Sequence, residues 1–188
     1  SKLGWYGGIS IPRQINLCSD GKIRSEPISE IEQLRINPLR YGAHMIEDSA
    51  PFEFEAGDGV HGEILATFDL TESSAEVIGF RIRGSVEQQT LLEFDLRLGE
   101  MIFDRKESGN ISARERRCVL ESASQSKLFV RIFLDSISVE VFTDGGRTTM
   151  TNNVFSNPSS NKLSIYTRNG RASLRNLQTY GIQSICSK

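Results

Sequence analysis

The acidic side chains best placed to do chemistry lie in one stretch of the sequence, Arg131–Gly146. Within it, Asp135, Glu140 and Asp144 follow one another at short spacing. Two carboxyl groups held side by side can share the work of a general acid and a general base. The stretch is therefore the first candidate for a catalytic pair.

The same residues also have a purely structural explanation, which we favour. Asp135 precedes Ser136, and short polar side chains of this kind stabilise turns by bonding nearby backbone. Glu140 then pairs across strands with an arginine such as Arg131 or Arg147. On this interpretation, one face of the local sheet is polar and no acid–base pair exists.

The elements around these residues are predicted from hydrophobic periodicity. Apolar residues fall on even numbers from Leu128 to Leu134 and on odd numbers from Ile137 to Val141. Strand side chains alternate with period two, so this change of phase requires a turn between two strands. Asp144-Gly145-Gly146 ends the second strand because glycine tolerates positive φ.

Similar short strands recur along the chain after residue 41, separated by turn residues and without intervening helices. The predicted strands are 52–56, 62–69, 76–83, 90–96, 100–104, 119–120, 128–135, 139–143, 147–154, 163–167 and 172–180. Their number and spacing predict an all-β fold, a two-sheet antiparallel β-sandwich of the jelly-roll or lectin-like type.

The first forty residues differ from the rest in composition and pattern. They are predicted to form a linker, and the sandwich domain is predicted to span residues 41–188. The linker is Gly-rich and extended, with a turn at Ser19–Gly21 and a short strand at Lys22–Arg24. One short helical turn is expected in Pro27–Arg35, where Ser29 and Glu32 have the spacing of a capping box.

Other reactive residue types have no supporting pattern. His44 and His61 have no partner at metal-ligand spacing, so neither a metal nor a cofactor is expected, and no Ser-His-Asp arrangement can be assigned. Asp104-Arg105 could grip a hydroxyl-rich ligand, but a local ion pair is the preferred explanation. The densest basic run, Arg114-Glu115-Arg116-Arg117, is interrupted by a glutamate, so a solvated strand face or loop is preferred to a phosphate-binding patch.

Composition limits the function classes. The formal net charge is −2, with 22 Lys and Arg against 24 Asp and Glu, so neither nucleic acid nor a membrane surface is an expected partner. No segment approaches the roughly 20 apolar residues of a membrane helix. The cysteines, Cys18, Cys118 and Cys186, are odd in number and widely spaced. They are expected to be free thiols and favour the cytoplasm, although the location is not determined.

Five strings, in order, resemble the C-terminal β-sandwich of glycoside hydrolase family 32, the β-fructosidases. They begin with W-Y-G-G and I-P-R at residues 5–13, which resemble the family's hinge, and D-G-K through L-R at residues 20–35, which resemble its linker. The remaining three are I-G-F-R-I-R at 78–83, F-D-R with S-G at 103–109, and F-L-D through D-G at 133–145. The resemblance covers nearly the whole chain.

The resemblance implies an accessory role. The family's catalytic carboxylates lie in the strings N-D-P-N, R-D-P and E-C of an N-terminal β-propeller, and none of these strings occurs in this sequence. The chain by itself is therefore expected to be non-catalytic. Its implied partner is the propeller of the same parent protein, a hydrolase of sucrose or fructan, which it would stabilise. A homodimer is a further possibility. The residues expected at the domain interface are Trp5, Ile9, Ile11 and Arg13.

A second function stays open, because related sandwich domains serve elsewhere as levan-binding modules. If a sugar is bound, the expected contacts are the polar strand faces, their turns and one strand-end tyrosine, because carboxylates and a guanidinium can hydrogen-bond a terminal fructose. These contacts are Arg131, Asp135, Glu140, Asp144 and Tyr166.

Overall fold

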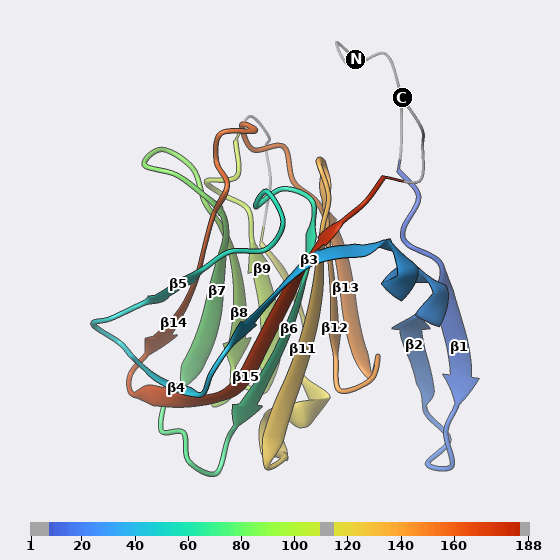
Figure 1. The fold of residues 1–188 in the computed structure, drawn as a ribbon. Coiled ribbons are helices and arrows are strands. Elements are labelled where there is room, and N and C mark those ends of the chain that lie inside the picture. The colour runs from blue at the N-terminus through green and yellow to red at the C-terminus, as the bar shows by residue number, and fades with distance from the viewer. Residues whose placement is uncertain (1–7, 110–114, 185–188) are drawn as a thin grey trace.

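The computed structural model describes residues 8–109 and 115–184, and two antiparallel sheets account for most of them (Figure 1). The first sheet has six strands in the order β10-β9-β8-β7-β14-β5. Their bounds are β5 Phe52–Phe54, β7 Val77–Gly84, β8 Thr90–Asp95, β9 Glu100–Asp104, β10 Arg116–Val119 and β14 Lys162–Arg168. All neighbouring pairs in this sheet are antiparallel.

The second sheet has seven strands. Six follow the order β13-β12-β11-β6-β15-β3. The seventh, β4, pairs with the first residues of β15, Arg171–Leu174. Their bounds are β3 Arg35–Tyr41, β4 His44–Glu47, β6 Gly62–Asp69, β11 Lys127–Leu134, β12 Ser138–Thr143, β13 Thr148–Asn153 and β15 Arg171–Ile182. A short 3₁₀ turn, η2 (Glu121–Ser124), precedes β11. The predicted antiparallel sandwich is confirmed.

The core lies between the inner faces of the two sheets. In β6, Ile64, Ala66 and Phe68 alternate inward, while the residues between them face away. Phe68 and Phe94 both meet the ring of Phe80 edge to face, with centroids 6.1 Å apart in each pair. These contacts join the sheets because Phe68 belongs to the seven-stranded sheet and the other two rings belong to the six-stranded sheet. Period-two alternation along the chain thus becomes a single two-sided core.

An N-terminal segment lies beside the seven-stranded sheet, on the right in Figure 1. It consists of the hairpin β1 (Arg13–Leu17) and β2 (Ile23–Pro27), followed by the 3₁₀ helix η1 (Ser29–Leu34). The helical turn was predicted, but the capping box is wrong. Ser29 is the first residue of η1, not its cap, and its hydroxyl lies 3.3 Å from the carboxylate of the adjacent Glu30.

The seven-stranded sheet begins before residue 41. Strand β3 pairs with β15 along Leu177–Ile182, although residues 35–40 were predicted to be linker. The strand could not be predicted from the sequence because of two of its residues. Pro38 cannot donate a ladder hydrogen bond, and Asn37 has a φ of +49°. A sheet edge tolerates both features, and the register of the ladder shifts at Thr179/Gly181.

Candidate functional site

The outer face of the seven-stranded sheet carries a second, smaller apolar cluster under the N-terminal segment. Phe133 of β11 and Phe142 of β12 meet edge to face at 6.1 Å, and Ile31 of η1 packs onto them. Ile11 and Leu34 complete the cluster as half-buried neighbours. The segment therefore packs on the sandwich as a partial third layer.

Glu140 is the polar centre of this contact. Its side chain is 4% exposed, and its carboxylate accepts the Ile11 N–H at 2.7 Å and an Arg13 N–H at 2.5 Å. Thr151 donates a third bond at 3.2 Å. The Arg13 guanidinium also lies over the Phe142 ring, 4.8 Å from its centroid. A charge buried this deeply needs such partners, because desolvation of an unpaired carboxylate is costly.

The partner predicted for Glu140 was wrong. Arg131 donates instead to Glu63, and Arg147 pairs with Asp20 and Glu121. The mispairing has a simple cause. Arg13 is 127 positions away in the sequence, so only the packing of the N-terminal hairpin on β12 brings it to Glu140.

Glu63 is a site residue that sequence reasoning missed. It is fully buried on β6, and its carboxylate accepts two bonds from Arg35, at 2.6 and 2.8 Å, and one from Arg131, at 2.6 Å. The hydrogen bond to Glu63 raises the pKa of Arg35 above its usual value, so this arginine stays charged. A lone glutamate beside the inward run Ile64–Phe68 was the available signal, because an acid in a strand needs a cationic neighbour.

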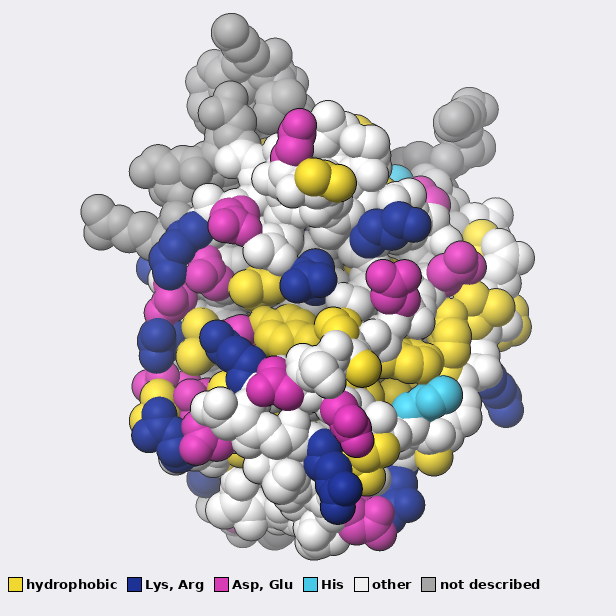
Figure 2. All heavy atoms as spheres, turned by 90° about the vertical axis from the view of Figure 1, so that its left-hand side faces the viewer, with side chains coloured by type: hydrophobic (Ala, Val, Ile, Leu, Met, Phe, Trp, Pro, Cys, Tyr) yellow, Lys and Arg dark blue, Asp and Glu magenta, His cyan; other side chains and the backbone are white. Residues whose placement is uncertain are grey.

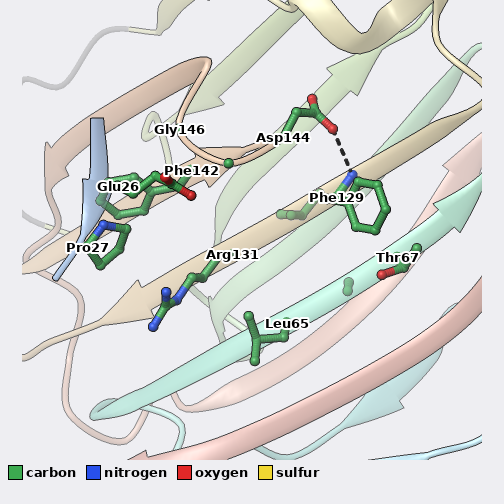
Figure 3. Close-up of a pocket in the computed structure, with 12 residues that line it drawn as sticks. Glu26, Pro27, Leu65, Thr67, Phe129, Arg131, Phe142, Asp144 and Gly146 are labelled. Carbon is green, nitrogen blue, oxygen red and sulfur yellow. Dashed lines mark hydrogen bonds between the residues drawn. The ribbon is translucent and has the colours of Figure 1, made fainter. Parts of the chain in front are cut away.

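Arg131 and Asp144, two of the five predicted sugar contacts, line one small cavity between β2 and the outer sheet face. Its volume is about 130 Å³, and Figure 3 shows the two side chains on opposite sides of it. Asp144 uses one carboxylate oxygen to accept the Phe129 N–H at 3.1 Å. Ligand pockets usually measure about 300–1,000 Å³, so this space is small for a sugar ring.

Gly146 explains how β2 can approach the turn between β12 and β13 so closely. Its φ is +77°, and a Cβ added there would lie 2.3 Å from the Ser25 carbonyl oxygen. The Ser25 N–H in turn donates to the Gly146 carbonyl at 3.0 Å. Only glycine permits both the backbone conformation and this contact.

Asp135 serves the β11–β12 turn, as predicted. Its carboxylate accepts the Ser136 N–H at 2.7 Å, and its own N–H donates to the Ser138 carbonyl at 2.9 Å. The side chain is 65% exposed and lies 3.9 Å from the His61 ring. Among the described residues, the Glu140 carboxylate is bonded by Ile11, Arg13 and Thr151 and not by the Asp135 turn.

His61 joins two loops through a chain of hydrogen bonds that no sequence pattern indicated. Its Nδ1 lies 2.8 Å from Asp58 Oδ2, and its Nε2 lies 2.8 Å from Ser136 Oγ. Burial opposes ionisation of Asp58, but hydrogen bonds from His61 and Val60 outweigh it and lower the pKa of this carboxyl. The order of groups is that of a Ser-His-Asp triad.

Exposure argues against catalysis by this chain of groups. The His61 and Asp58 side chains are 45% and 60% exposed, and a triad acts in a site from which water is excluded. The arrangement holds the loop before β6 against the β11–β12 turn. We therefore interpret it as a latch between two loops.

Tyr166 lies on the opposite side of the molecule, on β14 of the six-stranded sheet, and so cannot join the other four predicted contacts. Its hydroxyl donates to Glu93 at 2.5 Å, and burial together with this bond raises the pKa of the phenol. The ring covers Gly79, where an added Cβ would lie 2.3 Å from the ring carbon Cζ. Arg81 lies 5.9 Å from the ring centroid, and Arg168 pairs with Glu93.

The side of the molecule that carries β5 and β14 has a band of hydrophobic side chains across its middle (Figure 2). Basic and acidic side chains flank the band above and below. His44 belongs to this side of the fold through its contact with Phe52, whose ring centroid is 4.3 Å away. The figure thus shows an apolar surface bordered by charged groups on this side of the fold.

The four predicted interface residues have different environments. Trp5 lies outside the described residues. Ile9 is fully exposed, Ile11 is half-buried against the Phe133–Phe142 pair, and Arg13 is bound to Glu140. Beyond them the hairpin presents further apolar side chains to solvent, Ile15 at 61%, Leu17 at 76% and Ile23 at 64% exposure.

The ion pair predicted within Asp104-Arg105 is wrong. Asp104 binds Lys106 at 3.1 Å, whereas Arg105 turns away and donates to the Asn153 carbonyl at 2.9 Å. Among the described residues, no cluster of three His, Cys, Asp or Glu could hold a metal. Cys18 and Cys118 are free thiols, and Cys186 lies outside the described part of the chain.

No helix within the described ranges is long and apolar enough to cross a membrane.

Comparison with known proteins agrees with these observations. The family model described as "Glycosyl hydrolases family 32 C terminal" matches residues 30–181. A levanase of Bacillus sp. (strain L7) is 30% identical over 190 residues, which cover 97% of this chain and 21% of that protein. A sucrose-6-phosphate hydrolase of Zymomonas mobilis is 35% identical over 147 residues, or 77% of this chain and 28% of that protein.

Solved structures share the fold. Fructan 1-exohydrolase IIa of Cichorium intybus has a TM-score of 0.82 at 16% identity, over 93% of this chain and 41% of that one. The exo-inulinase of Aspergillus awamori has a TM-score of 0.78 at 21% identity, over 93% and 36%. The chain thus corresponds to a minor part of each of these proteins.

Proposed function

The chain belongs to the family of C-terminal domains of glycosyl hydrolases of family 32, and on that premise we propose that it is the accessory β-sandwich of a hydrolase acting on β-fructosides. It packs against a catalytic propeller in the same parent protein and leaves the cleavage to that domain. The names of its relatives, levanase and sucrose-6-phosphate hydrolase, support the substrate class. The chain spans only 21% and 28% of those two proteins, which leaves ample room for a separate catalytic domain.

The burial of two acidic side chains and their pairing with arginines support a non-catalytic role. Glycoside cleavage with retention needs two carboxyl groups about 5–5.5 Å apart and open to the substrate. Glu63 and Glu140 are 0% and 4% exposed at their side chains, and arginines occupy both. These acids stabilise the fold and are not accessible to a substrate.

The observation that carries the packing proposal is the exposed apolar row on the N-terminal hairpin. Ile9, Ile15, Leu17 and Ile23 are all more than 60% exposed, whereas the sandwich beneath them is anchored to the hairpin by Arg13–Glu140. Apolar side chains gathered on an anchored element mark a surface that another protein surface covers. The hairpin is also the part of the chain that resembles the family's hinge and linker.

The test combines activity and association. The purified chain should release no fructose from sucrose or levan. Mixed with the separately expressed catalytic domain of its parent, it should bind, and Leu17→Ser with Ile23→Ser should weaken that binding at least tenfold. Val86→Ser is the matched control, because Val86 is fully exposed on a turn far along the chain. Fructose release by the chain alone, or equal binding by all variants, would refute the proposal. Sedimentation velocity would show whether the hairpin instead pairs two copies.

The surface around Tyr166 favours a second candidate, a fructan-binding module. A ring held flat over Gly79 with Arg81 and Glu93 beside it supplies a stacking surface and hydrogen-bonding groups at one place. Of the other four predicted contacts, Arg131, Glu140 and Asp144 are engaged within the protein on the opposite sheet, and Asp135 serves the β11–β12 turn of that sheet. Tyr166 is thus the predicted contact on which this candidate rests.

Calorimetry with levan and with sucrose tests the second candidate. If the candidate is right, levan binds with a millimolar or tighter constant, and Arg81→Ala weakens it several-fold. Arg40→Ala is the control, because Arg40 is exposed on β3 of the other sheet. No heat with either sugar would rule out this function.

A further inference from the structure

A cleft opens where the edges of the two sheets face each other, between β10 of the six-stranded sheet and β13 of the seven-stranded sheet. Its volume is about 500 Å³, within the range of pockets that hold small ligands. Arg105, Arg116 and Arg117 line one side, and Asn152 lines the other. None of the described lining residues is acidic.

The positive charge in this cleft is only partly neutralised. Arg117 is bound by Glu100 at 2.8 Å and by Glu115, which also binds Lys106. Within the described ranges, Arg105 donates to a backbone carbonyl, that of Asn153, and to no carboxylate. Arg116 is exposed and has no acidic partner among the described residues. Two guanidinium groups thus share the cleft without a carboxylate between them.

Two buried donors of the lining residues have no acceptor in the part of the chain that the structure describes. Asn152 is 7% exposed and sits opposite Val139 on the inner side of its sheet, and its Nδ2 has no hydrogen-bond partner. The Nε of Arg105 is likewise buried and unpartnered. Nearly all buried polar groups in proteins are paired, so orphaned groups of this kind need an explanation. Both orphans here are donors without exposed surface, so a small rotation of each side chain is needed before an acceptor oxygen of a ligand can reach them.

The electrostatics agree with this geometry. Burial lowers the pKa of Arg105, and the neighbouring charge of Arg116 lowers it further. The negative charge of a dianion between the two groups would offset both effects. A planar guanidinium matches phosphate oxygens with parallel N–H bonds. Thr149 adds a hydroxyl-bearing side chain to the lining, which suits a polar, hydroxylated remainder of the ligand.

We propose that the cleft between β10 and β13 is a binding site for a phosphate monoester, with Arg105 and Arg116 holding the phosphate and Asn152 donating to one of its oxygens. Inorganic phosphate presents the same group, so it is the minimal form of this ligand. The site is distinct from the Tyr166 surface, and it meets the hairpin at Thr151, whose hydroxyl accepts a hydrogen bond from Arg13. The phosphate-site proposal can therefore be tested independently of the proposed accessory role.

Calorimetry on the whole chain at low salt tests the site with inorganic phosphate, fructose 6-phosphate and fructose. Both phosphates should bind and fructose should not. Tighter binding of fructose 6-phosphate would identify a sugar phosphate as the ligand, and equal binding would identify the phosphate group alone. Arg116→Met should weaken binding at least tenfold. This variant keeps the fold intact, because Arg116 is exposed and makes no described contact that the sheets need.

Arg40→Met is the matched control, since β3 forms the opposite edge of the seven-stranded sheet. Asn152→Leu tests the buried donor at similar volume, and its loss of affinity should persist at high salt. Bound phosphate should also slow the alkylation of Cys118, which lines the cleft, without changing that of Cys18. No binding of either phosphate, or equal weakening by Arg40→Met and Arg116→Met, would overturn the proposal.

Discussion

Arg13 and Glu140 lie 127 positions apart in the chain, yet the Arg13 guanidinium approaches the buried Glu140 carboxylate to 2.5 Å. The pair joins the first strand of the N-terminal hairpin to the middle of β12. Because the Ile11 N–H binds the same carboxylate, the backbone that enters the hairpin is held as well. The sandwich therefore sets the direction in which the N-terminal segment presents its exposed apolar row.

Breaking this pair should destabilise the chain strongly. Arg13→Met leaves the Glu140 carboxylate buried without its cation, and loss of one partner of a buried pair costs about 3–5 kcal/mol. Urea denaturation would measure the change in the free energy of unfolding. Arg40→Met, at an exposed position, should change it by less than about 0.5 kcal/mol. Adding Glu140→Gln to Arg13→Met should recover part of the loss, and an Arg13→Met effect no larger than that of the control would contradict the role of the pair.

Gly79→Ala should disturb the Tyr166 surface. A Cβ at residue 79 would lie 2.3 Å from the Tyr166 ring, so the ring must move and its bond to Glu93 must lengthen or break. Overpacking of this kind costs about 1–3 kcal/mol, which thermal or urea unfolding would detect. Gly42→Ala is the control, because an added Cβ there meets no atom within 4 Å. Equal stability of the two variants would show that the ring is not held against Gly79.

Asp69 should contribute to the loss of stability in acid. Hydrogen bonds from Thr71, and then from Arg175, lower the pKa of this carboxyl from 3.8 to about 2. A pKa that is lower in the folded state gives stability that is fully present above the unfolded value. That stability is lost as the pH falls from about 4 to about 2.

Urea midpoints measured between pH 5 and pH 2 would test this assignment. In Asp69→Asn the decline across this window should be shallower than in the parent chain, because the variant has no proton to take up at residue 69. Identical slopes for the two proteins would mean that Asp69 is not responsible. The neutral asparagine should also weaken the contact with Arg175, so the variant should be less stable at pH 5.

The chain Asp58–His61–Ser136 should behave as a latch and not as a catalyst. Ser136→Ala should leave the hydrolysis of p-nitrophenyl acetate unchanged from that of the parent chain. Its stability should fall by no more than about 1 kcal/mol, because exposed polar contacts are weak. His61→Asn removes both bonds of the latch and should loosen the loop before β6, as measured by faster amide exchange there. A burst of nitrophenol that vanishes in Ser136→Ala would show that the serine is a nucleophile.

Most strands could be predicted from the sequence, and the reason is local. In β6 and β9 the alternation of apolar residues and the flanking turns set the bounds, and both strands were predicted at their observed limits. Strand β3 was missed because Asn37 and Pro38 interrupt its pattern and most of its residues are exposed. Its identity depends on β15, which arrives more than a hundred residues later along the chain.

The candidate sites were harder to predict, because pairing between distant residues has no local signal. Asp135 was correctly assigned to a turn, since its partners Ser136 and Ser138 are adjacent. Glu140 was given the wrong arginine. The five predicted sugar contacts were treated as one group, but Tyr166 lies on the other sheet. The Asp58–His61–Ser136 chain has no sequence motif. The basic run that supplies Arg116 and Arg117 to the cleft was interpreted as a solvated face, because nothing local indicated that β13 lies opposite it.

The sequence by itself determined the class of fold, the family and the turn chemistry, because each is written in period-two alternation and in short strings of neighbouring residues. Only the tertiary structure decided which charges meet and which surfaces remain open. Electrostatic partners and clefts depend on how the two sheets and the N-terminal hairpin stack in space. Residues such as Arg13 and Glu140, or Arg105 and Asn152, become neighbours only when that stacking is complete.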